Sequence, residues 1–98
     1  MKTLARNTDE ARAVTMLRAL ANPVRYRIVQ ILARQQTCVT GDLVAELPVG
    51  QSTVSEHLAV LKEAGIVQGV IDGPSRCYCL NPESLRWLRE QLNLDGCC

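Results

Sequence analysis

The sequence contains no phenylalanine, and aromatic residues make up only 3% of its 98 residues. A hydrophobic core must therefore be built from Leu, Val, Ile and Ala. No apolar run approaches the roughly 18 residues of a transmembrane helix, and the N-terminal residues lack the apolar centre of a signal peptide. We therefore expect a cytoplasmic protein that does not enter the membrane, in a compartment where thiols stay reduced.

The sequence also has a low net charge and a single histidine. The formal net charge is only +1 at pH 7, so a surface that binds nucleic acid would need local clustering of basic residues. The five cysteines include no Cys-x-x-Cys pair, and the single histidine, His57, lies in the middle of a helical pattern without an evident acidic partner. These features argue against a thiol enzyme. In a reducing compartment, clustered cysteines more often bind metal or carry out redox chemistry.

The stretch from Gly50 to Gly65 carries the clearest pattern in the chain. Val54, Leu58 and Leu61 recur at intervals of four and three residues, which predicts a helix with one apolar face. Gly65 is suited to end this helix in a left-handed conformation. Short polar side chains gather at the N-terminal end of the helix, namely Gln51, Ser52, Thr53, Ser55 and Glu56. Such a helix suits the DNA major groove, although an ordinary amphipathic surface helix would show the same pattern.

Helical patterns also precede this stretch. Residues 9–21 combine an acidic first turn, which the helix dipole favours, with an apolar face. Asn22-Pro23 is a start signal for a second helix over residues 23–35, with Asn as N-cap and Pro at the first helical position. A short third helix is predicted over residues 41–47. A helix, a turn with glycine and a second helix together form the helix-turn-helix arrangement.

After Gly65 the apolar period changes from 3.6 to 2. Residues 66–71 and 76–80 are predicted to form the two strands of a hairpin, which would be a wing beside the helix-turn-helix. Asn81-Pro82 repeats the start signal and opens a last helix. The fold class is therefore mainly α with a β-hairpin wing.

The length and composition indicate one globular domain. Hydrophobic residues make up 47% and charged residues 21% of the sequence, which is typical of a folded chain. We expect a single winged-helix DNA-binding domain over residues 1–98, with a loose tail over residues 1–8 and a cysteine-bearing tail over residues 95–98.

The first and last helices carry more apolar surface than one small core can cover. The candidates for a dimer interface are Trp87 and the leucines of the last helix, with Met16 and Leu17 of the first. The alternative is that these residues complete the core of the monomer. A two-fold dimer would place two recognition helices about 34 Å apart, as DNA half-sites require.

The chain resembles the ArsR/SmtB family of bacterial metal-sensing repressors over roughly residues 17–92. The resemblance rests on LANPVRYRIVQIL, GDLVAEL, QSTVSEHLAVLKEAGIV and the hairpin ending in YCLN. It implies a dimeric winged helix with the terminal helices at the interface. It also implies a homodimer that represses its own operon and leaves the operator when an inducer binds.

The resemblance implies roles for individual residues as well. Four residues match the family's recognition-helix positions and would contact double-stranded operator DNA in the major groove: Gln51, Ser52, Thr53 and Ser55. Arg76, near the tip of the wing, would contact phosphate or the minor groove. His57 matches a position that often has a structural role in the family, and we expect it to be partly buried or to brace the recognition helix.

The sensing site must be assigned by testing each cysteine. The last helix holds no His or Cys, which excludes a zinc site of the family's Asp/His type there. The founding arsenic site of the family uses Cys-x-Cys, whereas this chain offers only Cys38 at that place. Cys77 and Cys79 share one face of a strand, where they could converge on a soft ion or pack as apolar residues.

Cys97 and Cys98 form a vicinal pair beyond the last helix, as in some arsenic sensors of the family. The resemblance therefore implies that this pair binds the inducer, with Cys79 or Cys77 as a third thiolate from the same or the partner subunit. The expected inducers are arsenite, methylated As(III) or Sb(III), which thiolates prefer as soft centres. No constitutive cofactor is expected.

Three other functions remain open. A repressor could sense redox state through a disulfide between the terminal pair and Cys38, or between subunits. It could instead sense another soft ion such as Cd(II), Pb(II) or Cu(I). A winged-helix module that binds protein in place of DNA is the third, and a steep salt dependence of operator binding would argue against it, because phosphate contacts release counterions.

Overall fold

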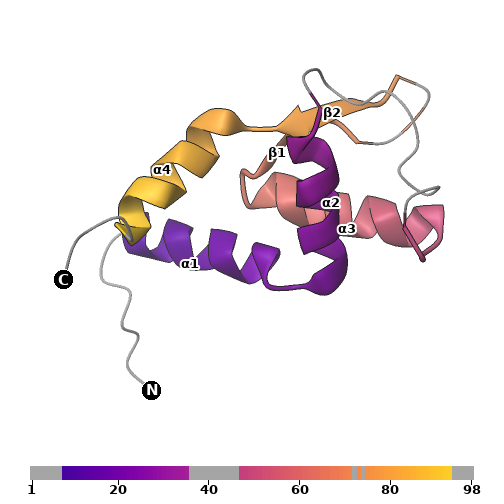
Figure 1. Ribbon diagram of the computed structural model, residues 1–98. Coiled ribbons are helices and arrows are strands. Elements are labelled where there is room, and N and C mark those ends of the chain that lie inside the picture. The colour runs from indigo at the N-terminus through magenta and orange to yellow at the C-terminus, as the bar shows by residue number, and fades with distance from the viewer. Residues whose placement is uncertain (1–7, 36–46, 72, 74, 94–98) are drawn as a thin grey trace.

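The computed structural model describes residues 8–35, 47–71, 73 and 75–93 (Figure 1). Its elements, in chain order, are α1 (Thr8–Leu20), α2 (Pro23–Ala33), α3 (Gln51–Glu63), β1 (Val67–Val70), β2 (Cys77–Leu80) and α4 (Pro82–Leu92). The mainly helical fold with a hairpin wing is confirmed. The predicted third helix falls outside the described residues except for Leu47, as do the cysteine-bearing tail and residues 1–7.

The two Asn-Pro signals start helices as predicted. The Asn22 side chain accepts hydrogen bonds from the backbone N–H groups of Val24 (2.9 Å) and Arg25 (3.1 Å). The Asn81 side chain accepts one from the backbone of Ser84 at 3.2 Å. Each such cap stabilises its helix by about 1 kcal/mol. The helix bounds differ from the prediction by one or two residues: α1 begins at Thr8, and α2 ends at Ala33.

The hairpin is a two-stranded antiparallel sheet that follows α3 directly. Gly65 has φ +82, the left-handed value predicted for the end of α3. Val67 pairs with Leu80, and Val70 pairs with Cys77. The strands are each one or two residues shorter than predicted. The backbone N–H of Asn81 also bonds to the Ile66 carbonyl at 2.8 Å, so the open end of the hairpin is fixed next to both α3 and α4.

Gly69 is the residue in β1 that cannot carry a side chain. Its φ is +111, and a Cβ there would overlap the carbonyl oxygen of Cys77 and lie 3.0 Å from the Cα of Tyr78. A glycine inside a strand often marks such a close approach of two backbones. The strand pair therefore depends on this glycine for its spacing.

The core lies where α1, α2, α3 and the hairpin meet. Its largest fully buried side chains are Tyr78, Met16, Ile28, Ile31, Leu58, Leu61 and Ile66. The prediction of a core made only of Leu, Val, Ile and Ala was wrong in two respects, since Tyr78 and Met16 are among its largest members. Tyr78 fills the space beneath the wing because the pleat turns it inward from β2.

The terminal helices α1 and α4 meet at the side of the molecule away from the hairpin (Figure 1). Among the candidates for a dimer interface, Met16 and Leu88 are buried in the monomer and so belong to its core. Leu17 and Leu92 are 39% and 37% exposed. Trp87 is half-buried, with the Arg12 guanidinium 4.0 Å above its ring. Arg12 also donates to the Ser84 hydroxyl at 3.3 Å, which ties α1 to α4.

Candidate nucleic-acid interface

The helix α3 presents its polar first turns to solvent. Val54, Leu58 and Leu61 are at most 3% exposed and hold the helix on the core. Gln51 and Ser52 are exposed, whereas Thr53 and Ser55 are half-buried at the edge of the same surface. All four predicted DNA contacts thus lie on the first two turns of one helix, clear of its buried side.

The first turn of α3 has no side-chain cap. Its N-cap residue is Gly50, which has no side-chain hydrogen bond to offer, and no residue of the first turn is acidic. Backbone N–H groups at such a helix start can bind a phosphate, because they point along the positive end of the helix dipole. Phosphate contacts of this kind fix the register of a protein on DNA.

Arg76 lies at the start of the return strand of the wing. It is half-buried, and its backbone N–H donates to the Gly73 carbonyl at 3.4 Å. In Figure 1 the beginning of β2 and the first turn of α3 both lie away from the junction of α1 and α4. This arrangement allows one DNA duplex to meet the wing and the helix together.

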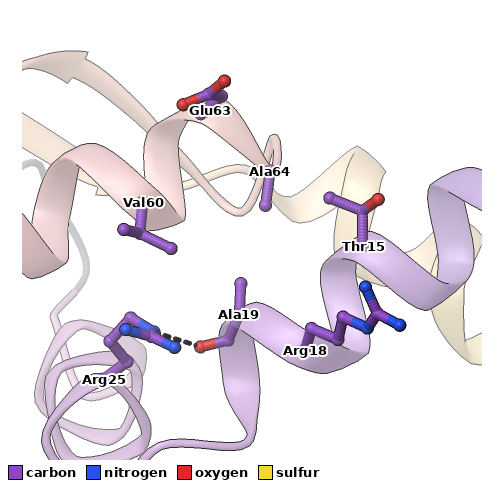
Figure 2. Close-up of a pocket in the computed structure, with 7 residues that line it drawn as sticks. All are labelled: Thr15, Arg18, Ala19, Arg25, Val60, Glu63 and Ala64. Carbon is purple, nitrogen blue, oxygen red and sulfur yellow. Dashed lines mark hydrogen bonds between the residues drawn. The ribbon is translucent and has the colours of Figure 1, made fainter.

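Arg25, on α2, links α3 to the end of α1. Its Nε donates to the Ala19 carbonyl at 2.7 Å, a bond drawn in Figure 2. One of its terminal nitrogens lies 3.3 Å from Nδ1 of His57 on α3. An arginine can only donate, so Nδ1 is the acceptor and the ring proton is on Nε2. His57 is half-buried and braces α3, as predicted; its partner Arg25 was not foreseen from the sequence.

We expect His57→Leu to weaken operator binding about fivefold, because α3 would lose a hydrogen bond worth about 1 kcal/mol that holds its angle to α2. His57→Gln should bind operator nearly as well as the wild type, because its side-chain oxygen can accept from Arg25. Fluorescence anisotropy gives the affinities, and thermal melting controls for folding. Equal affinities of the two variants would contradict a role for the Arg25 bond.

The two described cysteines lie on one face of β2. Cys77 and Cys79 flank buried Tyr78 and pair with Val70 and Gln68 across the hairpin. Both are half-buried, so neither is packed in the core. Cys77 is a free thiol, whereas Cys79 takes part in a disulfide. Cys38, Cys97 and Cys98 themselves lie outside the described part of the chain.

Within the described residues, no group of three or more His, Cys, Asp or Glu side chains could hold a metal ion. The described helices likewise include none with the length and apolar character needed to cross a membrane. A thiolate site would therefore have to draw on the cysteines that the described residues do not include.

Comparison with known proteins agrees with this geometry. The family described as "Bacterial regulatory protein, arsR family" matches residues 22–68, which include α2 and α3. The transcriptional repressor SmtB of Mycobacterium tuberculosis is 49% identical over 65 residues, or 66% of this chain. The chain spans about half of that protein, 47% of its length.

Two further relatives match over more of their length. The regulator Rv2034 of M. tuberculosis is 43% identical over 75 residues, which cover 76% of this chain and 69% of that protein. The arsenic resistance regulator ArsR1 of Pseudomonas putida is 32% identical over 77 residues, which cover 79% of this chain and 60% of that protein.

Solved structures show the same fold. A crystal structure described as a "possible transcriptional regulator for arsenical resistance" is 40% identical, with a TM-score of 0.66 over 81% of both chains. The cadmium sensor CMTR of M. tuberculosis is 33% identical, with a TM-score of 0.57 over 87% of this chain and 94% of that one. The three relatives and the first of these structures are named as regulators or repressors of transcription, and CMTR is named as a metal sensor. With a helix-turn-helix match and relatives that share most of their length, the chain belongs to the ArsR/SmtB family of regulators.

Proposed function

We propose that the protein is a transcriptional repressor that binds operator DNA as a homodimer and is released by an inducer bound to cysteine thiolates. The observation that carries the proposal is the polar, uncapped start of α3, exposed on a helix that three buried residues and Arg25 hold in place. Regulators of this family typically form homodimers on operator DNA, which supports the two-fold arrangement.

The proposed contacts divide into base-reading and positioning groups. Gln51, Ser52, Thr53 and Ser55 would enter the major groove, where amide and hydroxyl groups can bond to base edges and phosphates. Arg76 would bind phosphate or the minor groove beside the wing. Because phosphate contacts release counterions, operator affinity should fall steeply as salt rises.

The proposed inducer is a trivalent arsenical or antimonite, bound mainly by Cys97 and Cys98. Two similar proteins, ArsR1 and the possible regulator for arsenical resistance, are associated with arsenic and support this choice, whereas CMTR is a cadmium sensor. Relatives of this chain thus differ in their metals. Trivalent arsenic takes three thiolates and its methylated form only two, so the number of cysteines in the site selects between them.

The length of α4 favours two cysteines from one subunit. Cys77 and Cys79 precede α4, and its 11 residues are about 16 Å long. Cys97 is four positions beyond Asn93 at the other end of α4, and four residue steps span at most about 14 Å. To reach the wing of its own subunit, the tail would have to run back fully extended. We therefore propose a two-thiolate site that prefers methylarsenite, or a third thiolate from the partner subunit.

The test of the proposal is operator binding by fluorescence anisotropy, with DNA from upstream of the protein's own gene. Arsenite, methylarsenite, antimonite, Cd(II), Zn(II) and peroxide are titrated separately. We expect the trivalent arsenicals to release the operator, and methylarsenite to do so at the lowest concentration. Release by Cd(II) alone would contradict the arsenical assignment, and failure to bind any upstream DNA would contradict the repressor.

Cys97→Ser and Cys98→Ser should each leave operator binding intact but abolish release by methylarsenite, because one thiolate cannot hold the arsenic tightly. Cys77→Ser is the matched control on the wing and should respond as the wild type does to methylarsenite. A normal response of either terminal variant would show that the terminal pair is not the site.

A redox switch is a second candidate, and the disulfide at Cys79 is the observation that favours it. In that case peroxide would release the operator, a thiol reductant would restore binding, and arsenicals would have no effect on the oxidised protein. Cys79→Ser would then remain bound to the operator in peroxide. If the disulfide has no regulatory role, the variant and the wild type should respond to peroxide in the same way.

A further inference from the structure

A cavity of about 290 Å³ lies between α1 and the C-terminal half of α3 (Figure 2). Its walls are Thr15, Arg18, Ala19, Arg25, Val60, Glu63 and Ala64. None of the residues proposed to contact DNA or the inducer takes part in it. Its volume is at the lower end of the range for small-molecule sites, which suits a small metabolite.

The middle of the cavity is apolar. Ala19, Val60 and Ala64 point into the gap between the two helices in Figure 2. Val60 is 41% exposed although it is a large apolar side chain, and Ala19 is 3% exposed and forms the floor. A short branched hydrocarbon would cover Val60 and remove its surface from water, which is favourable.

The two ends of the cavity are basic and have hydrogen-bond donors to spare. The Arg25 guanidinium has five N–H donors, and two of them have partners among the described residues, the Ala19 carbonyl and His57. Arg18, on α1, has neither a hydrogen bond nor an ion pair with any described side chain. Glu63, at the rim on α3, also has no partner in the described part of the chain.

We propose that this cavity binds a small carboxylate with a short apolar body. A guanidinium pairs with a carboxylate through two parallel hydrogen bonds, which places the anion at Arg18 or Arg25 and the hydrocarbon on Val60 and Ala64. A free apolar amino acid and a branched carboxylic acid share this chemistry. They differ in the ammonium group, which would lie near Glu63.

The position of Arg25 couples the cavity to the DNA-reading helix. The same guanidinium that faces the ligand holds the end of α1 through Ala19 and holds α3 through His57. A carboxylate on Arg25 competes for its donors, and a ligand between α1 and α3 changes the distance between those helices. Operator affinity therefore falls when the cavity is filled, by about fivefold, the lower end of common allosteric couplings. This coupling rests on the proposed operator binding, whereas ligand binding itself does not.

The test uses L-leucine, isovalerate and isoamylamine as probes of the full-length protein. Thermal melting without DNA measures binding, and operator anisotropy measures coupling. We expect both carboxylates, or L-leucine alone, to raise the melting temperature, and isoamylamine to have no effect. Arg18→Gln should need about tenfold more ligand for the same shift, because a charge-assisted pair is lost. Arg86→Gln, which removes an exposed arginine from α4, should respond as the wild type does.

The outcomes distinguish an amino acid from a simple carboxylate as the ligand, and they test the cavity site separately from the repressor function. A response to L-leucine but not isovalerate, lost in Glu63→Gln, assigns the amino acid; a response to both assigns the carboxylate alone. No shift with either carboxylate, or an equal shift with isoamylamine, overturns the cavity site, and an unchanged titration of Arg18→Gln overturns the assignment of the anion to Arg18. A melting shift without any operator binding keeps the cavity site and refutes the repressor. A melting shift with unchanged operator affinity overturns the coupling.

Discussion

Replacement of Gly69 by alanine should cost about 3 kcal/mol of folding stability and lower the melting temperature by about 15 °C. The backbone at this residue has φ +111, which L side chains rarely adopt, and the added Cβ would overlap the Cys77 carbonyl oxygen. Relief requires β1 to move away from β2, which breaks the pairing of Gly69 with Tyr78. Tyr78 would then lose its fixed place in the core, so the damage extends beyond the wing.

Gly73 provides the matched control for Gly69. It has φ +83, but a Cβ there would meet nothing within 4 Å. Gly73→Ala should therefore cost only the backbone strain, about 1 kcal/mol. Thermal melting of both variants at one protein concentration separates strain from overlap. Equal losses for Gly69→Ala and Gly73→Ala would mean that the contact with Cys77 is relieved at no cost.

Joint replacement of Ser52 and Ser55 by alanine should weaken operator binding about 30-fold and leave the fold and inducer binding unchanged. Each hydroxyl is assigned one contact with DNA, and the loss of each is worth about 1 kcal/mol. Ser52 is exposed and Ser55 is half-buried, so neither substitution opens a cavity in the core. Operator anisotropy at several salt concentrations is the measurement.

The salt dependence separates the serines from the arginine of the wing. The double serine variant should keep the wild-type slope of affinity against salt, because it removes no charge. Arg76→Ala should reduce that slope by about one, since it removes one phosphate contact. Gln91→Ala on α4 is the control, an exposed polar residue on a helix that carries no proposed DNA contact. Normal operator binding by the double serine variant would refute the assigned reading face.

Local signals in the sequence were enough to place most elements. The Asn-Pro dipeptides, the apolar stripe of α3 and the glycine after it each depend on neighbouring residues, and the structure confirms them. The strands and helices were placed to within one or two residues, because the ends of elements depend on weak competing hydrogen bonds. The orientation of α3, with its polar residues outward, followed from the same stripe.

Local sequence signals could not predict contacts between residues that are far apart in the sequence. Arg25 and His57 are 32 residues apart, and nothing in either neighbourhood announces the pair. Met16 has the apolar character of both a core and an interface residue, and only the packing of α1 against the other helices decides between them. Two signals in the sequence did point to the missed features of the hairpin. The alternation on β2 turns Tyr78 inward when the cysteines face outward, and a glycine within a strand marks a close approach.

The stacking of Arg12 on Trp87 makes the fluorescence of Trp87 a reporter of the contact between α1 and α4. Trp87 is the one tryptophan in the sequence, and it lies where α1 and α4 meet. A cation 4.0 Å above the ring changes the energy of the indole excited state, so the emission depends on the contact between these two helices. Any ligand or DNA that separates them shifts the fluorescence of the unlabelled protein. Such binding reactions can therefore be followed in real time without attaching a dye.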